Sequence, residues 1–402
     1  MKKRAGLQLV LLLALLPLLA GCWNSRELRD LAIVVGMGID KAAGGEGYRL
    51  SFQIMNPGST SLGAKGGGGG DANTISVYWA EDKSLFGALR KASQKVPRQL
   101  FFAHIQLLVI GEPLAKEGLR ELFDFYERSH ELRLNTPVLV SRGVDAKAVL
   151  NLAMPLEPSS ALGNAKRIRN TSRVWAHNAE MEVTDIIKSL NRSGSMAISG
   201  IKIEGDRRKG GTKANLEKVE LPAHAEIQGM ALFKEGKWAG WADGAEARGL
   251  IRVLDKVKGT IVALPCGKQE DGISLEVIQS KTNVTYRMEN GSPAFQIHVK
   301  EEGNLNEIRC PIDPSQRSEV VKLQKEWADA AKREIEKAVK GAQSRRSDYL
   351  GLGRIVESTD MKSWKSMEEN WPSLFAEAKV EVSVETFIRR TGMRSTPYLL
   401  KK

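Results

Sequence analysis

The sequence has 402 residues, and its 60 lysines and arginines against 48 acidic residues give a formal net charge of +12. This length allows about two or three domains with cores of their own. Five histidines and three cysteines, with no Cys-x-x-Cys and no closely spaced pair of histidines, exclude the common zinc-binding patterns.

The N-terminus has the parts of a bacterial lipoprotein signal peptide. Residues 2–4 are basic, and the uncharged run 7–20 is shorter than the roughly 20 residues of a membrane-spanning helix. The run leads into Leu19-Ala20-Gly21-Cys22, where small residues before a cysteine suit the signal peptidase. We expect removal of residues 1–21 and attachment of an S-diacylglycerol and an N-acyl group at Cys22. The alternative is an uncleaved anchor, or a plain signal peptide with an incidental cysteine.

The rest of the chain is then a body tethered to the outer face of the cytoplasmic membrane, since several acyl chains together anchor stably. Export argues against nucleic acid as the partner of the positive charge. An anionic lipid surface or an acidic partner fits better, with solvated helix faces as the plain alternative.

Residues 22–203 are predicted to form an N-terminal region of alternating strands and helices. The Gly44-Gly45 turn favours a hairpin of the first two strands, and the loop 56–73, with its glycines 66–70, is expected to be mobile. The expected strands are 31–39, 48–55, 75–79, 104–110, 137–140 and 196–203. The expected helices are 85–96, 112–129, one capped by Asp145 and running to 152, and 184–191.

The charged, glycine-rich segment 204–219 is predicted to be an inter-domain loop, followed by a C-terminal α/β region at 220–391 and a basic tail at 392–402. The pattern predicts a hairpin of strands 223–233 and 237–241, then a helix from Asp243 to 257. It also predicts strands at 260–264, 273–284, 294–299 and 380–388, and amphipathic helices at 315–345 and 361–377. We expect an α+β fold of two to three mixed domains, with mainly antiparallel or mixed sheets covered by helices.

No catalytic constellation is visible, so the sequence argues against an enzyme and indicates no cofactor. The histidines are scattered, and the Walker-like segment 205–213 has Gly211 where the lysine belongs. Both a disulfide and two buried thiols fit Cys266 and Cys310, and we favour free thiols. Trp364 and Trp371 stand seven residues apart, which fits a core better than a ligand-stacking pair.

Several motifs together resemble the C subunit of GerA-type nutrient germinant receptors of spore-forming bacteria, the Ger(x)C lipoproteins. They cover nearly all of the chain after residue 21. Asn24 stands where the family often has Asp, and glycines 66–70 look like an expanded loop. The motifs, in the family's order, are Gly21-Cys22-Trp23, Glu27-Leu28, the segment 31–40 ending in Gly36-Met-Gly-Ile-Asp40, the segment 137–142, Gly229-Met-Ala-Leu-Phe233, Asp348-Tyr-Leu-Gly-Leu-Gly353, Trp364, Trp371 and the strand from Val380.

The resemblance implies three mixed α/β domains and a role in triggering spore germination. It implies a polytopic A subunit and a transporter-like B subunit as partners in the spore's inner membrane. Because the family's ligand pocket is generally placed in the B subunit, Cys22 is the only functional residue carried over.

Two other functions are compatible with an exported lipoprotein but fit this sequence less well. A substrate-binding lipoprotein of a membrane importer usually has two doubly wound lobes with a central cleft, whereas the strands here pair largely as hairpins. An exported cell-wall hydrolase needs a clustered acid/base pair or metal ligands, and the sequence has neither.

Overall fold

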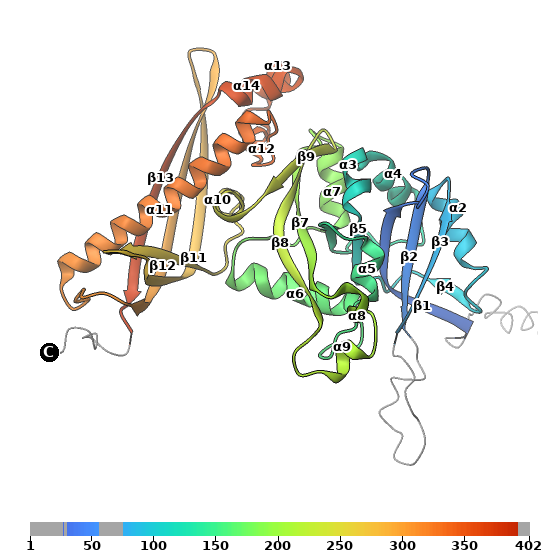
Figure 1. Cartoon of the computed structure of the whole chain (residues 1–402). Coiled ribbons are helices and arrows are strands. Elements are labelled where there is room, and N and C mark those ends of the chain that lie inside the picture. The colour runs from blue at the N-terminus through green and yellow to red at the C-terminus, as the bar shows by residue number, and fades with distance from the viewer. Residues whose placement is uncertain (1–26, 28–29, 56–74, 393–402) are drawn as a thin grey trace, which may run out of the picture.

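Two β-sheets, joined through β9 and α10, organise the computed structural model of the chain, which describes residue 27 and residues 30–55 and 75–392 (Figure 1). The first sheet has the strand order β3-β2-β1-β5-β6-β7-β8-β9, with β4 paired to β1. Its strands are β1 (Leu31–Lys41), β2 (Tyr48–Met55), β3 (Ile75–Asp82), β4 (Gln99–Phe101), β5 (Leu107–Ile110), β6 (Val138–Ser141), β7 (Met196–Gly205), β8 (Ala223–Lys234) and β9 (Lys237–Ala242).

The centre of the first sheet is parallel and its flanks are antiparallel. Strands β1, β5, β6 and β7 pair in parallel, while β2 and β3 on one side and β8 and β9 on the other pair antiparallel. Helices cover both faces, which explains why the central strands are continuous apolar runs. One face carries α2 (Leu85–Ala92), α3 (Glu112–Glu117), α4 (Arg120–Arg128) and α7 (Val183–Leu190), and the other carries α5 (Ala146–Asn151) and α6 (Ser160–Val174).

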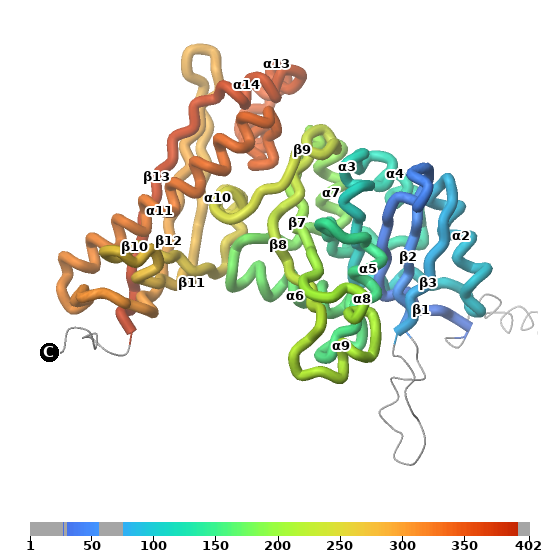
Figure 2. The backbone as a smooth tube through the Cα atoms, viewed as in Figure 1, coloured from blue at the N-terminus to red at the C-terminus, as the bar shows by residue number. Residues whose placement is uncertain are grey.

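The second sheet has the order β10-β11-β12-β13 and is covered by one long helix. Figure 2 shows α11 running along this sheet, and the helix buries Leu323, Trp327 and Ile335. Strand β13 lies parallel to β12, and this pairing requires the long helical connection that joins the two strands. The elements are α10 (Gly244–Val253), β10 (Thr260–Cys266), β11 (Gln269–Glu289), β12 (Ser292–Ile308), α11 (Arg317–Ser344), α12 (Leu352–Thr359), α13 (Met361–Met367), η4 (Glu368–Asn370), α14 (Trp371–Glu377) and β13 (Lys379–Arg390).

The α+β fold with mixed sheets is confirmed, and so are the hairpins. Strands β1 and β2 pair across the turn that contains Gly45, whose φ is +80°. The β11–β12 turn has Asn290 at φ +50° and Gly291 at φ +80°, a left-handed pair that this dipeptide favours. Turn chemistry therefore predicted both connections.

Two predicted helices are divided in the structure, and two observed helices were not predicted. The helix expected at 112–129 is broken into α3 and α4 at Gly118, whose φ of +127° no helix accommodates. The helix expected at 361–377 is divided into α13, η4 and α14. Helices α6 and α12 were not predicted. The buried face of α6 consists largely of small residues such as Ala161 and Gly163, which give little hydrophobic periodicity.

The predicted inter-domain loop 204–219 connects two neighbouring strands of the first sheet. Strands β7 and β8 pair antiparallel from Met196↔Phe233 to Gly205↔Ala223, so the first sheet continues across this segment. The segment itself holds two short helices, α8 (Arg207–Gly210) and α9 (Ala214–Glu217). The chain leaves the first sheet only after β9. The expected mobile loop 56–73 and the basic tail, apart from residue 392, lie outside the described residues.

Candidate functional site

The predicted site residues fall into two groups. Cys22 lies outside the described residues. Cys266 and Cys310 form a disulfide with a Cα–Cα distance of 6.2 Å, which corrects the preference for free thiols. The bond joins the end of β10 to the residues that follow β12. Because 44 residues separate the two cysteines, nothing in the sequence indicated that their Cα atoms are close enough for a disulfide.

The described residues contain no clustered metal ligands, and the pocket beside α3 is shallow. No group of three or more His, Cys, Asp or Glu within residues 27, 30–55 and 75–392 is arranged to hold a metal ion. A shallow pocket of about 250 Å³ lies between α3, α4 and the β8–β9 turn, lined in part by Tyr48, Arg120 and Lys237. This volume is below the range of typical small-molecule sites, about 300–1,000 Å³. Within the same residues, no helix is long and apolar enough to cross a membrane.

The Gly36-Met-Gly-Ile-Asp40 motif holds α5 and α6 against the first sheet. A Cβ at Gly36 would lie 2.6 Å from the Cβ of Ala161, so glycine lets α6 approach β1 closely. Asp40 is buried, and its carboxylate accepts hydrogen bonds from the backbone N–H groups of Ala146 (2.8 Å) and Lys147 (3.1 Å). Asp40 therefore caps α5 from 106 residues away, whereas the side chain of Asp145, the predicted cap, makes no capping bond.

The Asp348-Tyr-Leu-Gly-Leu-Gly353 motif does the same for α12. The buried carboxylate of Asp348 accepts hydrogen bonds from the N–H groups of Leu352 (2.9 Å) and Gly353 (2.6 Å) and from Nε1 of Trp371 (3.0 Å). Gly353 packs directly on the Trp371 ring, where a Cβ would lie 2.8 Å from Nε1. Burial raises the pKa of Asp348 to about 6, although these donors lower it. The motif thus fixes the start of α12 against Trp371, and we call Asp348 with its three donors the Asp348 clasp.

Trp364 and Trp371 belong to the core of the second half of the chain. Their ring centroids are 5.2 Å apart in an edge-to-face arrangement. Trp371 also packs against Phe295 and Phe375 and is 3% exposed. The core interpretation of this pair is confirmed, and the ligand-stacking alternative is not supported.

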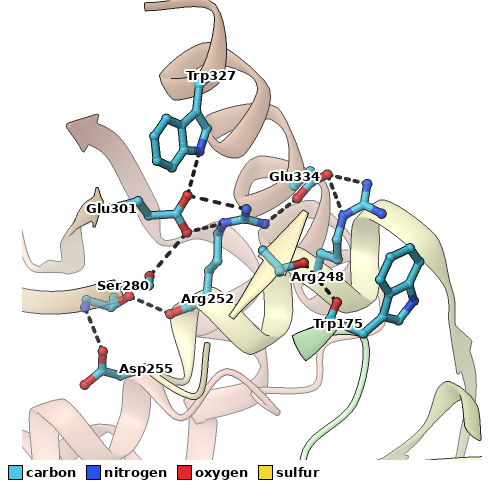
Figure 3. Close-up of polar contacts among 10 residues, drawn as sticks. Trp175, Arg248, Arg252, Asp255, Ser280, Glu301, Trp327 and Glu334 are labelled. Atoms are coloured by element: carbon cyan, nitrogen blue, oxygen red, sulfur yellow. Dashed lines mark hydrogen bonds and ion pairs between the residues drawn. The ribbon is translucent and has the colours of Figure 1, made fainter. Parts of the chain in front are cut away.

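A buried charge network is the main polar feature at the junction of the two sheets (Figure 3). Arg252 on α10 and Glu301 on β12 are almost fully buried and are joined at 2.9 Å from Nε to Oε1. Glu301 also accepts hydrogen bonds from Nε1 of Trp327 (2.9 Å) and from the hydroxyl of Ser280 (3.2 Å). Burial tends to lower the pKa of Arg252, but Glu301 and Glu334 offset this effect and raise it. The arginine is therefore a permanent buried cation.

Glu334 on α11 extends the network toward the first sheet. Its carboxylate accepts from Nη1 of Arg252 and from Nε of Arg248, the latter at 2.7 Å. Arg248 in turn donates from Nη1 to Nε2 of His177 (3.0 Å), which follows α6. The backbone carbonyl of Trp175, beside His177, accepts from the Thr260 hydroxyl at 2.9 Å. Helices α10 and α11, strand β12 and the segment after α6 thus meet through one continuous set of ion pairs and hydrogen bonds.

Apolar packing makes this junction continuous. One core cluster contains Met230 and Leu232 of β8 together with Leu250 of α10 and Ile335 of α11. The Ser347 hydroxyl adds a bond to the carbonyl of Phe233 at 3.0 Å. The arrangement pairs its charges and joins the two sheets through buried side chains.

Because His177 is partly buried beside Arg248, we expect the free energy of unfolding to depend on pH. Burial, followed by the charge of Arg248, lowers the pKa of His177 to about 4. An unfolded chain protonates this histidine near pH 6.5, so its stabilising contribution is complete above that pH and is lost as the pH falls toward 4. Because the ring is partly solvated, we expect a loss of about 1 kcal/mol.

The measurement is urea unfolding of the protein and of His177→Gln at pH 7.5 and pH 5. The stability difference between the two proteins should shrink at pH 5, while that of a variant at the exposed His130 should stay constant. An equal difference at both pH values for His177→Gln contradicts the prediction.

Sequence reasoning missed Asp40, Asp348 and the Arg252 network as sites. Two features of the sequence point to buried charges in the Arg252 network. Arg252 interrupts the apolar run 250–254, and Glu334 follows Trp327 by seven residues, which places a carboxylate on the buried face of α11. Neither signal identifies the partner.

Comparison with known proteins decides the family. The sequence profile described as "Spore germination protein N-terminal domain" matches residues 24–203, and the one described as "Spore germination B3/ GerAC like, C-terminal" matches residues 228–392. The chain is 32% identical to spore germination protein KC of Bacillus subtilis (strain 168) over 399 residues, 98% of each protein. The chain belongs to the GerAC-like family of spore germination proteins. The resemblance found in the sequence is confirmed.

More distant relatives agree. Spore germination protein B3 of the same organism is 22% identical over 93% of this chain and 95% of its own length. The crystal structure of the GerBC protein superimposes with a TM-score of 0.56 at 18% identity, covering 88% of this chain and 97% of that one. This structural likeness supports the α+β fold.

Proposed function

We propose that this protein is the lipid-anchored, non-enzymatic C subunit of a nutrient germinant receptor. The observation that supports this proposal most strongly is the 32% identity to spore germination protein KC over 98% of both chains. The alignment therefore includes nearly the whole length of that relative. The protein acts on the outer face of the spore's inner membrane, with an A and a B membrane subunit as partners. The predicted lipobox ending at Cys22 supplies the anchor.

The described architecture supports an interaction module. Its charges are paired across the junction of the sheets, and the pocket between α3 and α4 is small. A unit of this kind can present a fixed surface to membrane subunits, and a lipid tether raises its effective concentration beside them. The importer-type binding protein is less well supported, because the second sheet is a hairpin-based β10-β11-β12-β13 sheet and no second doubly wound lobe is present among the described residues.

The test is Cys22→Ala in the spore-forming host. We expect the protein to leave the membrane fraction and nutrient-triggered germination to fall strongly, while germination by non-nutrient triggers persists. Total protein level in the spore and germination through an unrelated nutrient receptor serve as controls. Normal nutrient germination by spores whose protein is soluble, in a host lacking redundant receptors, would refute the anchored-subunit proposal.

A further inference from the structure

Three cationic side chains surround one exposed tryptophan at the edge of the first sheet. Trp79 on β3 is 36% exposed. The guanidinium carbon of Arg49 lies 5.5 Å from the centroid of its ring, and the ammonium groups of Lys95 and Lys147 lie at 4.2 Å and 4.4 Å. The three cations come from β2, from the segment after α2 and from the first turn of α5, so the tertiary fold has brought them together.

Among the described residues, no carboxylate lies within ion-pair distance of the two lysines, whereas Arg49 has two such partners. Arg49 is paired with Glu81 at 2.7 Å and with Asp145 at 3.7 Å. Lys95 donates to the backbone carbonyl of Trp79 at 2.8 Å, and neither it nor Lys147 has an ion-pair partner within the described ranges. Burial, followed by the nearby Arg49, lowers the pKa of Lys147, although the charges of Asp145 and Glu81 oppose this effect. An anion beside the indole would relieve this repulsion.

The cluster lies near the end of the molecule where the proposed tether attaches. Leu31, the first residue of β1, pairs with Gln99 of β4, four residues after Lys95. Nine residue steps separate Cys22 from Leu31, and an extended chain of this length reaches about 30 Å. Figure 1 shows β1, β3 and β4 at one end of the molecule and α11 with β13 at the other. A membrane that holds Cys22 is therefore within reach of Trp79.

We propose that Trp79, Lys95 and Lys147 form a membrane-docking site that binds the headgroups of anionic phospholipids. Tryptophan is favoured at membrane–water interfaces, and ammonium groups are attracted to an anionic lipid surface. Docking fixes the orientation of the first sheet relative to the bilayer, which a lipid tether alone leaves free. This inference rests on the proposed membrane anchoring, because the tether at Cys22 would hold the cluster beside a bilayer and so favours lipid over an acidic protein partner as the occupant.

The test uses the processed chain, beginning at residue 22, with Cys22→Ser so that no acyl chain contributes. Co-sedimentation is measured with phosphatidylcholine vesicles and with vesicles that also contain phosphatidylglycerol. We expect binding only to the second kind, weakened at high salt because screening shortens the range of the attraction. Lys95→Gln with Lys147→Gln should lower the partition coefficient roughly 30-fold, about 5-fold for each cation. Trp79→Ala should lower it as well.

Lys322→Gln with Lys325→Gln is the matched control. Both lysines are exposed in the first turns of α11, at the opposite end of the molecule, and their removal changes the net charge equally. All variants must retain the parent's thermal unfolding midpoint. Equal loss of binding in the two double variants, or no preference for phosphatidylglycerol, overturns the proposed site. Absence of vesicle binding also overturns it and favours an acidic protein partner, while a germination defect of Cys22→Ala would leave the proposed function standing.

Discussion

Arg252→Met is expected to lower the free energy of unfolding by about 3–5 kcal/mol. The substitution leaves the carboxylate of Glu301 fully buried without its cation, and Glu334 loses one of its two arginines. Trp327 and Ser280 still donate to Glu301, but two neutral hydrogen bonds do not compensate a buried charge. Urea unfolding at neutral pH, monitored by circular dichroism, measures the change.

Two further variants separate burial from charge. Arg389→Met removes the partner of Glu302, the residue next to Glu301 on β12, but this pair is exposed and we expect almost no change. Arg252→Met combined with Glu301→Gln should recover part of the loss, because the uncompensated charge is gone. A loss for Arg252→Met no larger than that for Arg389→Met would show that the network does not stabilise the junction.

Asp348→Ala is expected to cost about 3–5 kcal/mol. Three buried donors, the N–H groups of Leu352 and Gly353 and the Trp371 indole, lose their only described acceptor, and each unsatisfied buried donor costs about 1–3 kcal/mol. Thermal unfolding should therefore show a strongly lowered midpoint, and the near-ultraviolet signal of the tryptophans should change because Trp371 loses its orientation.

Asp360→Ala is the matched control for this clasp. Asp360 caps α13 through the N–H of Ser363 at 3.0 Å, the same type of bond at a helix start that is partly exposed to solvent. Water replaces the lost acceptor there, so the expected change is much smaller. Similar losses for the two aspartates would indicate that Asp348 contributes only an ordinary cap.

The buried Arg252 network and the Asp348 clasp are expected to make the second half of the chain rigid. Ion pairs of Arg252 and Glu334 connect α10, α11 and β12. Arg248 extends these contacts by a hydrogen bond to His177, which follows α6. We expect these satisfied buried contacts to restrict motion between the two sheets. Variants of the network that still fold should loosen these contacts, which hydrogen exchange at β8 and β12 would detect.

Local signals in the sequence determined much of this protein. Apolar runs marked β1 and β6, glycine and asparagine turns marked both hairpins, and the repeat around Trp327 marked α11, because each depends on neighbours within a few residues. The lipobox and the ordered motifs pointed to the family, which the full-length relatives confirm.

Tertiary structure alone decided what those motifs do. Asp40 caps a helix 106 residues away, Arg252 meets Glu301 across 49 residues, and Cys266 bonds Cys310 across 44. The continuation of the first sheet through β8 and β9 and the gathering of three cations around Trp79 also depend on packing of distant segments. Periodicity and turn chemistry act over a few residues, whereas partners and domain limits are set by which surfaces meet after the chain has folded.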